Sequence, residues 1–385
     1  MADPFTLEII TNMLDYAGEE MFLVFGRTAK SPVIYEVLDY AVAISDSQGD
    51  LVSIAPGVPG FAGILDYTVK EVLEKYGRGG IKPGDIFANN LPYRSGTHLN
   101  DVTLIKPVFY KDELVAFTVA KGHWSEVGGM RFGSWTSDAT EVYQEGLQLP
   151  NVKLYIEGKP NRDVIDIIRE NSRLPSLVLG DMEAQIAALR AGERRILEAI
   201  EKYGLDSFMA AIDKIHRDAR RKSLMHLSRL PKGEFEAEDY IDDDGISDDP
   251  VYVRVKVSIG EDKFVADFTG SAPQTRGPIN SPYPGTVTAV RIVYLAITDP
   301  HERLTTSYFS PLKVVAPPGT VFNPTKPAPT STFWESMMFA SDLVWKALAE
   351  HIPDKLTAGH FNTVGADILG GVSDRTGEPF AIVEP

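Results

Sequence analysis

The sequence has 385 residues, and because single domains usually stop growing at roughly 250–300 residues, this length favours two packed cores. Its formal net charge of −16, with no basic run to offset it, opposes binding to nucleic acid or to an anionic membrane surface. The lack of cysteine excludes disulfides, thiolate nucleophiles and cysteine zinc sites, so a metal site has to use His, Asp or Glu side chains. Residues 1–5 carry no signal pattern, and no stretch approaches the ~18 unbroken apolar residues of a membrane span. We therefore expect a soluble, cytoplasmic protein.

The first third of the chain alternates between helical and strand-like patterns. Apolar residues at helical spacing over residues 4–26 predict an N-terminal helix. Two pairs of short β-prone runs flank polar turns and predict two hairpins, with Asp39 just before the first strand. The predicted strands are 40–44 with 51–54, and 102–109 with 114–120. Between the hairpins we expect a helix at 66–78, a turn at 82–85, a strand at 86–88 and a polar loop at 89–100.

The remainder of the chain changes character twice. Residues 124–150 are rich in Gly, Ser and Thr with few periodic apolar positions, which predicts a long ordered loop of the kind that serves a site. Residues 164–230 are helical almost throughout, with a stop at Gly204. The acidic run 234–249 marks a change of composition. Beyond it we expect strands at 251–259 and 263–269, a helix at 286–298 and an extended proline-rich passage at 317–329.

These elements predict an α+β fold with mixed β hairpins and sheets, a helical segment in the middle and two subdomains. The first, residues 1–233, contains the hairpins and the helical segment 164–230, and it carries the candidate metal site. The second, residues 234–385, is a smaller α/β domain.

The residues best suited to chemistry lie at the ends of the second hairpin. His98 and Asp101 precede its first strand, and His123 and Glu126 follow its second. In an antiparallel hairpin the start of one strand lies beside the end of its partner, so we expect Asp101 and His123 to be neighbours. Such a nitrogen and oxygen ligand set suits Zn²⁺, Mn²⁺ or Fe²⁺, and Asp39 is a candidate fourth ligand. The alternative is that these side chains only cap strands and turns.

Other chemical motifs are absent or incomplete. The sequence has neither a dinucleotide fingerprint nor a phosphate-binding loop, so we expect that this chain does not bind ATP. Ser134 and Ser172 lack the partner pattern of a triad nucleophile. The remaining histidines are expected at the surface (His216 and His226) or in capping and packing roles at element ends (His301, His351 and His360).

Several weak motifs, taken together in order and spacing, resemble one family. Two of them are Gly96-Thr97-His98-Leu99-Asn100-Asp101-Val102 and Gly122-His123-Trp124-Ser125-Glu126-Val127-Gly128-Gly129. The set resembles the hydantoinase B/oxoprolinase family, which includes subunits of ATP-dependent hydantoinases, 5-oxoprolinases, caprolactamase and acetone or acetophenone carboxylases. The other matching segments are 3–9, 36–40, 144–147, 171–173 with 180–181, 192–195, 277–280, and 316–320 with 323–324.

The resemblance implies one divalent metal ion, zinc or manganese, held by Asp39, His98, Asp101 and His123, with His123 and Glu126 as catalytic residues. It also implies a hydantoinase A-type partner that uses ATP and Mg²⁺ to activate the substrate, in a heteromultimer. Three positions depart from the family. Glu126 stands where many members have Asp, Trp124 replaces a second His, and Phe61 stands where we expect His; the last two favour a carboxylase-like or lactam-type pocket over a hydantoinase pocket.

We therefore expect a metal-containing, substrate-processing subunit that hydrolyses a C–N bond of a cyclic amide, namely a hydantoin, a lactam or oxoproline. The first alternative is a subunit of an ATP-dependent acetone or acetophenone-type carboxylase. The second is a structural subunit whose metal stabilises the fold. Relatives continue into a glycine-rich segment where this sequence stops at residues 384–385, so we expect the second domain to be truncated relative to the family.

Overall fold

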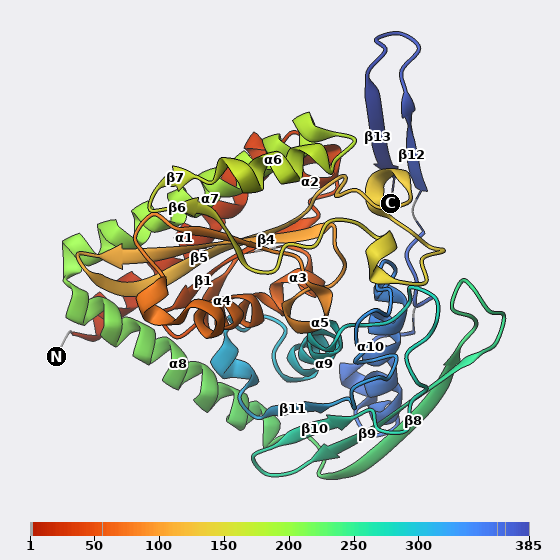
Figure 1. Ribbon diagram of the computed structural model, residues 1–385. Coiled ribbons are helices and arrows are strands. Elements are labelled where there is room, and N and C mark those ends of the chain that lie inside the picture. The colour runs from red at the N-terminus through yellow and green to blue at the C-terminus, as the bar shows by residue number, and fades with distance from the viewer. Residues whose placement is uncertain (1–2, 56, 360, 366, 385) are drawn as a thin grey trace.

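The computed structural model describes residues 3–55, 57–359, 361–365 and 367–384. His360, Pro385 and the first two residues, on which some sequence-based expectations fall, lie outside the described residues. The described chain has the predicted α+β architecture, with a seven-stranded sheet, a four-stranded sheet and a two-stranded hairpin (Figure 1).

The seven-stranded sheet contains both predicted hairpins. Its strand order is β2-β1-β5-β4-β3-β6-β7, and every neighbouring pair is antiparallel. Strands β6 and β7 were not expected from the sequence. The strands are β1 (Tyr40–Asp46), β2 (Leu51–Ile54), β3 (Ile86–Asn89), β4 (Asp101–Tyr110), β5 (Glu113–His123), β6 (Val152–Ile156) and β7 (Lys159–Pro160).

Helices bury both faces of this sheet. Alternate residues of β1 face opposite cores, with Tyr40 and Val42 on one side and Ala41 and Ala43 on the other, because strand side chains alternate with a period of two. The long helices α1 (Pro4–Thr28) and α7 (Pro175–Tyr203) cover the first face, and α4 (Leu65–Gly80) covers the second. Close approach requires a glycine in α7, since a Cβ at Gly192 would lie 2.3 Å from the sulfur of Met21.

The central helical region has the predicted extent and the predicted stop at Gly204, and it has one further break, between α6 and α7. Gly204 adopts φ 85°, a left-handed value that favours glycine, and it separates α7 from α8. Helix α8, green in Figure 1, runs from the first sheet toward the second. The remaining helices here are α2 (Pro32–Tyr35), α3 (Pro59–Ala62), α5 (Pro92–Ser95), α6 (Arg162–Glu170) and α8 (Leu205–Leu227).

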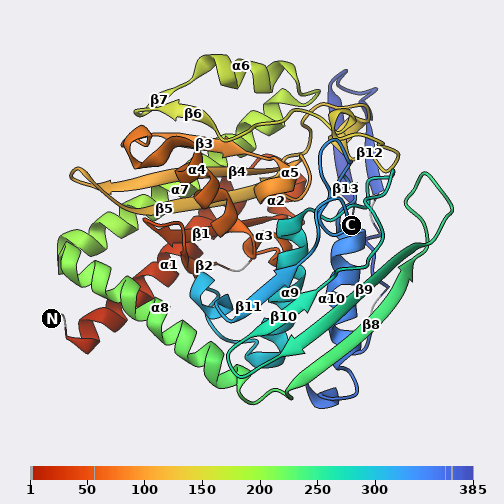
Figure 2. The same ribbon diagram turned by 60° about the horizontal axis from the view of Figure 1, so that its bottom comes forward.

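The second sheet has the order β11-β10-β9-β8, and its β10–β11 pair is parallel. Helix α10 packs against β8 and β9, and α9 packs against α10 (Figure 2). These helices and strands surround a second hydrophobic core. The elements are β8 (Gly233–Ile241), β9 (Val251–Ile259), β10 (Phe264–Asp267), β11 (Leu312–Val315), α9 (Tyr283–Thr298) and α10 (Trp334–Leu348).

The acidic run 234–249 is not all loop between the two predicted domains. Its first half forms β8, in which Phe235 and Ile241 are buried while Glu234 and Glu236 face solvent. The acidic residues concealed this strand because they occupy its exposed side. The boundary at residues 233/234 stays a prediction.

The other described elements are short. The C-terminal hairpin projects from the body of the molecule (Figure 1). No helix among the described residues combines the length and the apolar character that crossing a bilayer requires. These short elements are η1 (Phe132–Ser134), η2 (Val142–Gln144), η3 (Thr306–Phe309), η4 (Pro353–Lys355), β12 (Asp367–Val372) and β13 (Pro379–Glu384).

A buried ion pair joins helix α4, which covers the second face of the first sheet, to helix α9 of the second hydrophobic core. Asp66 of α4 receives two hydrogen bonds of 3.0 Å from the guanidinium of Arg291, which belongs to α9. The guanidinium also donates to the Gly63 carbonyl and lies 5.1 Å from the centre of the Phe309 ring. Burial alone would raise the pKa of Asp66, but the charge of Arg291 outweighs it and lowers this pKa.

We expect the Asp66→Asn substitution to lower the free energy of unfolding by roughly 3–5 kcal/mol, because it leaves the Arg291 charge buried and unpaired. Urea unfolding at pH 7 measures this. The matched control is Glu234→Gln, which removes an exposed ion pair with Lys256 and should change stability by less than about 1 kcal/mol. An equal effect of both substitutions would contradict the anchoring role of Asp66.

Candidate metal site

Three adjacent strands of the first sheet bring the candidate ligands to one edge. Strand β5 lies between β1 and β4, and its register pairs His123 with Asp101 of β4 and Gly122 with Tyr40 of β1. The His123 N–H donates to the carbonyl of Asp39 at 3.1 Å. The predicted proximity of Asp101 and His123 is therefore confirmed, and the backbone of Asp39 lies beside them.

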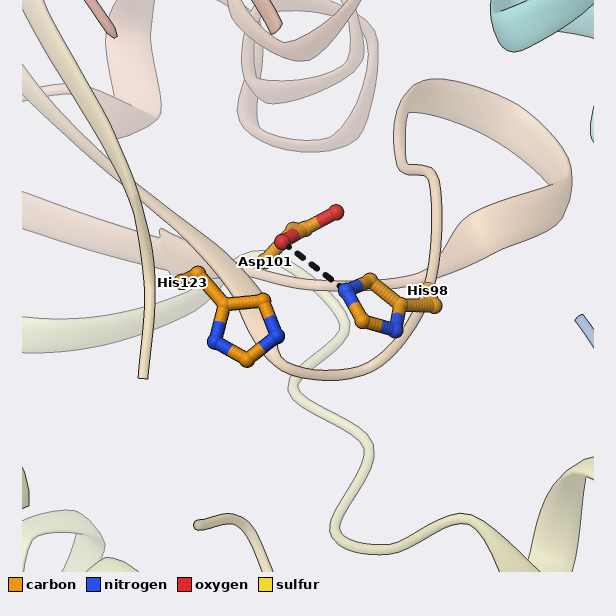
Figure 3. Close-up of side chains that lie close together, drawn as sticks. All are labelled: His98, Asp101 and His123. Atoms are coloured by element: carbon orange, nitrogen blue, oxygen red, sulfur yellow. Dashed lines mark hydrogen bonds and ion pairs between the residues drawn. The ribbon is translucent and has the colours of Figure 1, made fainter. Parts of the chain in front are cut away.

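The side chains of His98, Asp101 and His123 form a compact, buried cluster (Figure 3). One possible ligand atom from each lies within 4.8 Å of the other two. Nε2 of His98 is 3.1 Å from Oδ1 of Asp101, and the two imidazole ring centres are 5.0 Å apart.

Local hydrogen bonds fix the two turns that carry these side chains. Thr97 donates its hydroxyl to Oδ2 of Asp101, so both carboxylate oxygens of Asp101 are oriented. The side-chain amide of Asn100 donates to the carbonyls of Trp124 and Gly133, each at 3.0 Å. The Trp124 N–H donates back to the Asn100 carbonyl at 2.8 Å. Asn100 thus joins the turn before β4 to the turn after β5.

A fully buried lysine lies under the cluster, and sequence reasoning missed it. Nζ of Lys121 donates to the Asp101 carbonyl at 3.2 Å and lies 5.4 Å from the centre of the Phe61 ring. Burial lowers the pKa of Lys121 to about 8, although the charges of Asp101 and Asp39 oppose the change. Phe61, which stands where the family resemblance suggests His, therefore packs against this ammonium group.

The charges of the cluster favour an uncharged His123 ring beside an ionised Asp101 carboxylate. Burial would raise the pKa of Asp101, but the neighbouring His98 and Lys121 hold it well below its ordinary range. Burial and the nearby His98 lower the pKa of His123 to about 4, so at neutral pH this ring is uncharged. Neutral imidazole and ionised carboxylate are the forms that bind metal ions.

The cluster fits a divalent cation. Nδ1 of His98 and Nδ1 of His123 are both buried, and neither has a hydrogen-bond partner among the described residues. A buried polar atom without a partner is costly, so this pair needs an explanation. Two nitrogens and a carboxylate suit Zn²⁺, Mn²⁺ or Fe²⁺.

Asp39 lies outside this compact cluster, but the charge of Asp101 affects its pKa. Its side chain is partly buried, and burial together with the negative charge of Asp101 raises the pKa of Asp39 to about 8, against the effect of Lys121. A cation between the two carboxyl groups would relieve this repulsion. The role of Asp39 as a fourth ligand stays a prediction.

Glu126 is buried and fully engaged in another set of contacts. Its carboxylate accepts hydrogen bonds from the Ser134 hydroxyl and the Gly128 N–H, both at 2.6 Å. Arg173 donates to it at 2.9 Å. These bonds close the loop after β5, and Glu126 is not among the three clustered residues. Its role as a catalytic residue stays a prediction.

Three aromatic side chains that sequence reasoning did not single out surround the histidines. Trp334 and Phe333 lie 5.7 and 5.5 Å from the His98 ring, and Trp135 lies 6.4 Å from the His123 ring. We call Trp135, Phe333 and Trp334 the aromatic wall. Trp124 is not part of it, because its indole N–H is buried against Gln185. No local motif could have revealed the wall, since its members come from both sides of the predicted domain boundary.

The buried Glu145 ties the two segments of the wall together. Its carboxylate accepts the N–H groups of Thr330 at 2.5 Å and Ser331 at 2.8 Å. The Ser331 hydroxyl in turn accepts the N–H of Thr136, next to Trp135. Burial raises the pKa of Glu145 to about 8, because these hydrogen bonds only partly compensate for lost hydration.

Two histidines expected at the surface are in fact partly buried and paired. His216 lies 3.1 Å from an Asp46 carboxylate oxygen and 2.8 Å from the Ser307 hydroxyl. His226 lies 3.8 Å from Asp299. The expectation failed because α8 packs between the two parts of the molecule.

We expect Glu145→Gln to stabilise the protein at high pH. A carboxyl whose pKa rises from 4.5 to about 8 on folding keeps a proton that the unfolded chain releases, so stability falls across that pH range. Glutamine resembles the protonated form. The variant should therefore match the wild type near pH 5 and exceed it by roughly 2 kcal/mol or more near pH 8.5, as measured by urea unfolding. A constant difference at both pH values would contradict this assignment.

Comparisons with known proteins agree on the family that this chain resembles. A family model described as hydantoinase B/oxoprolinase matches residues 3–385. The B component of a putative D-/L-hydantoinase from Pseudomonas sp. is 36% identical over 93% of this chain and 63% of its own length. The crystal structure of an ATP-dependent caprolactamase from Pseudomonas jessenii superimposes with a TM-score of 0.93 at 30% identity, over 99% of this chain and 66% of that chain.

A nucleotide-free acetone carboxylase structure has a TM-score of 0.91 at 17% identity, over 99% of this chain and 53% of that chain, which shows a shared fold. This chain thus spans less than two thirds of the length of the relatives that it matches.

Proposed function

The chain belongs to the hydantoinase B/oxoprolinase family, and from that premise we propose that it is the metal-dependent, substrate-processing subunit of an ATP-dependent complex that opens a cyclic amide by hydrolysis. The observation that carries this proposal is the buried cluster of His98, Asp101 and His123, with its two unpartnered imidazole nitrogens. Similarity to a caprolactamase at 30% identity over nearly the whole chain supports an amide substrate.

His98, Asp101 and His123 would hold the ion, with Asp39 completing a set of four. When bound there, a zinc or manganese ion would supply Lewis-acid polarisation of a carbonyl group. The protein would supply orientation. Thr97 fixes one Asp101 oxygen, and Lys121 places a positive charge beside both carboxyl groups.

Ring opening adds water across the C–N bond, so that the carbonyl carbon gains a hydroxyl group and the nitrogen gains a proton. The attacking water gives up one proton, which a base near the cluster would pass to the leaving nitrogen. His123 is one proposed catalytic residue, because its ring is uncharged at neutral pH, lies within the cluster and has an unpartnered Nδ1 that could accept this proton. Glu126 is the other, although its bonds to Ser134 and Arg173 support a positioning role for the loop after β5.

The proposed partner is a hydantoinase A-type chain that uses ATP and Mg²⁺. One relative is named as a single component of a hydantoinase and another as an ATP-dependent enzyme, and this sequence has no phosphate-binding loop. A heteromultimer in which the partner activates the amide and this chain processes it accounts for these facts.

A second candidate is a subunit of an ATP-dependent ketone carboxylase. The observation that favours it is the apolar surround of the cluster, in which Phe61 replaces an expected polar histidine and the aromatic wall covers the imidazoles. Such a surround suits a small ketone as well as a lactam. A third candidate is a structural subunit whose metal stabilises the fold.

We expect the full chain to bind about one divalent ion and the His123→Ala variant to lose it, because the remaining ligands are too few to hold the ion. Metal content after dialysis, measured by mass spectrometry, tests this. The control is His301→Ala, which removes an exposed histidine and should leave the metal content unchanged. A wild-type chain that binds no divalent ion would remove the basis of the proposal.

We expect the assembled complex to release ring-opened product from a hydantoin or lactam in the presence of ATP, and to lose roughly a thousandfold or more of this turnover on chelation. A parallel assay supplies ATP, labelled bicarbonate and acetone or acetophenone. Label in a β-keto acid would establish the carboxylase instead. Full turnover by an assembled but metal-free complex would favour the structural role.

A further inference from the structure

The aromatic wall lies beside the two histidines of the candidate metal site. Trp334 meets the His98 ring at right angles, and Trp135 lies beside His123, so each of the two imidazoles has its own indole neighbour. The two indoles also touch each other, with ring centres 4.8 Å apart and planes at 89°. They therefore form a corner of two perpendicular aromatic surfaces.

The tryptophans and the histidines differ in how far they are exposed to solvent. The side chains of His98 and His123 are only 3% and 5% exposed. Trp135 and Trp334 are partly exposed, while Phe333 behind them is buried. The indoles therefore present more surface to solvent than the imidazoles do.

The wall is fixed by hydrogen bonds rather than formed by two loose side chains. Glu145 accepts two N–H groups from residues 330–331, just before Trp334. The Thr136 N–H, next to Trp135, donates to the Ser331 hydroxyl at 2.8 Å. The backbone of each tryptophan segment is thereby held to the other, so the corner exists without a ligand.

The chemistry of the wall selects among ring types. The indole N–H of Trp334 already donates to Glu335 at 3.1 Å, which leaves the π surface as its main contribution to binding. A flat, uncharged ring can stack on such a surface, whereas a puckered ring touches it poorly. A carboxylate is repelled by the negative face of an aromatic ring and by the neighbouring Glu335.

We propose that Trp135 and Trp334 are the specificity-determining residues of this site, and that they bind the face of a flat, neutral ring such as a hydantoin or an aryl group attached to the reacting carbonyl. This inference rests on the proposed function for its location beside the reacting centre. It goes beyond that function by ranking the substrates: flat neutral rings first, puckered lactams next and rings that carry a carboxylate last.

Ligand binding to the zinc-loaded full chain at pH 7 tests this ranking. The probes are 5-phenylhydantoin, ε-caprolactam and 5-oxoproline, measured by calorimetry and by quenching of tryptophan fluorescence. We expect 5-phenylhydantoin to bind most tightly. Trp334→Leu and Trp135→Leu should each weaken its binding by roughly three- to tenfold or more, the range of an aromatic contact.

The matched control is Trp345→Leu, because this tryptophan lies further along the same helix, α10, and packs against the second core. It should leave 5-phenylhydantoin affinity unchanged. Metal content and thermal melting of each variant verify that the site and the fold are intact; if Trp334→Leu fails to fold, the milder Trp334→Phe, which should retain part of the affinity, takes its place.

Several outcomes would overturn the inference. They are unchanged affinity in both wall variants, tighter binding of ε-caprolactam or 5-oxoproline than of 5-phenylhydantoin, and no binding of 5-phenylhydantoin to the wild type at millimolar concentration. A failure of the proposed function would give a different result. A chain that binds no metal but still binds 5-phenylhydantoin through Trp135 and Trp334 would contradict the metal-dependent function and leave the recognition role of the two tryptophans standing.

Discussion

The antiparallel register of β1, β5 and β4 is the constraint on which the candidate site depends. Because β5 lies between its two neighbours, its C-terminal end meets the N-terminal ends of both, and this brings Asp39, Asp101 and His123 to one edge of the sheet. A shift of one residue would turn these side chains to the opposite face. The buried residues on both faces of the strands prevent such a shift, so the hydrophobic core also fixes the geometry of the cluster.

Both parts of the molecule contribute side chains to the candidate site. The first sheet supplies the imidazoles and carboxylates, while the start of α10 supplies two of the three aromatic rings that cover them. Two buried carboxylates connect the parts in different ways: Asp66 pairs with the charged Arg291, and Glu145 accepts only neutral donors. Asp66 is therefore ionised in the folded protein, whereas Glu145 holds a proton up to a higher pH than usual. The contributions of these two contacts to stability consequently change in opposite directions with pH.

Much of the fold could be predicted from periodicity, and the failures have physical causes. The two hairpins of the first sheet and the long helical region were predictable because burial on a sheet or helix leaves a repeating apolar pattern. Strand β8 was missed because charged residues fill its exposed side, and α10 was missed because it follows a proline-rich passage without a clear start signal. His216 was misjudged because a basic helical segment reads as surface, whereas α8 packs against η3.

The sequence by itself determined the residue types of the candidate site, their places at strand ends and, through the ordered motifs, the family. It could do so because strand pairing within one hairpin is a local property, which makes Asp101 and His123 neighbours in any fold that keeps the hairpin. Only the tertiary structure decided which groups surround the cluster. The engagement of Glu126 by Arg173 and the approach of Trp334 to His98 depend on the packing of segments that are distant along the chain, and such contacts leave no periodic trace in the sequence.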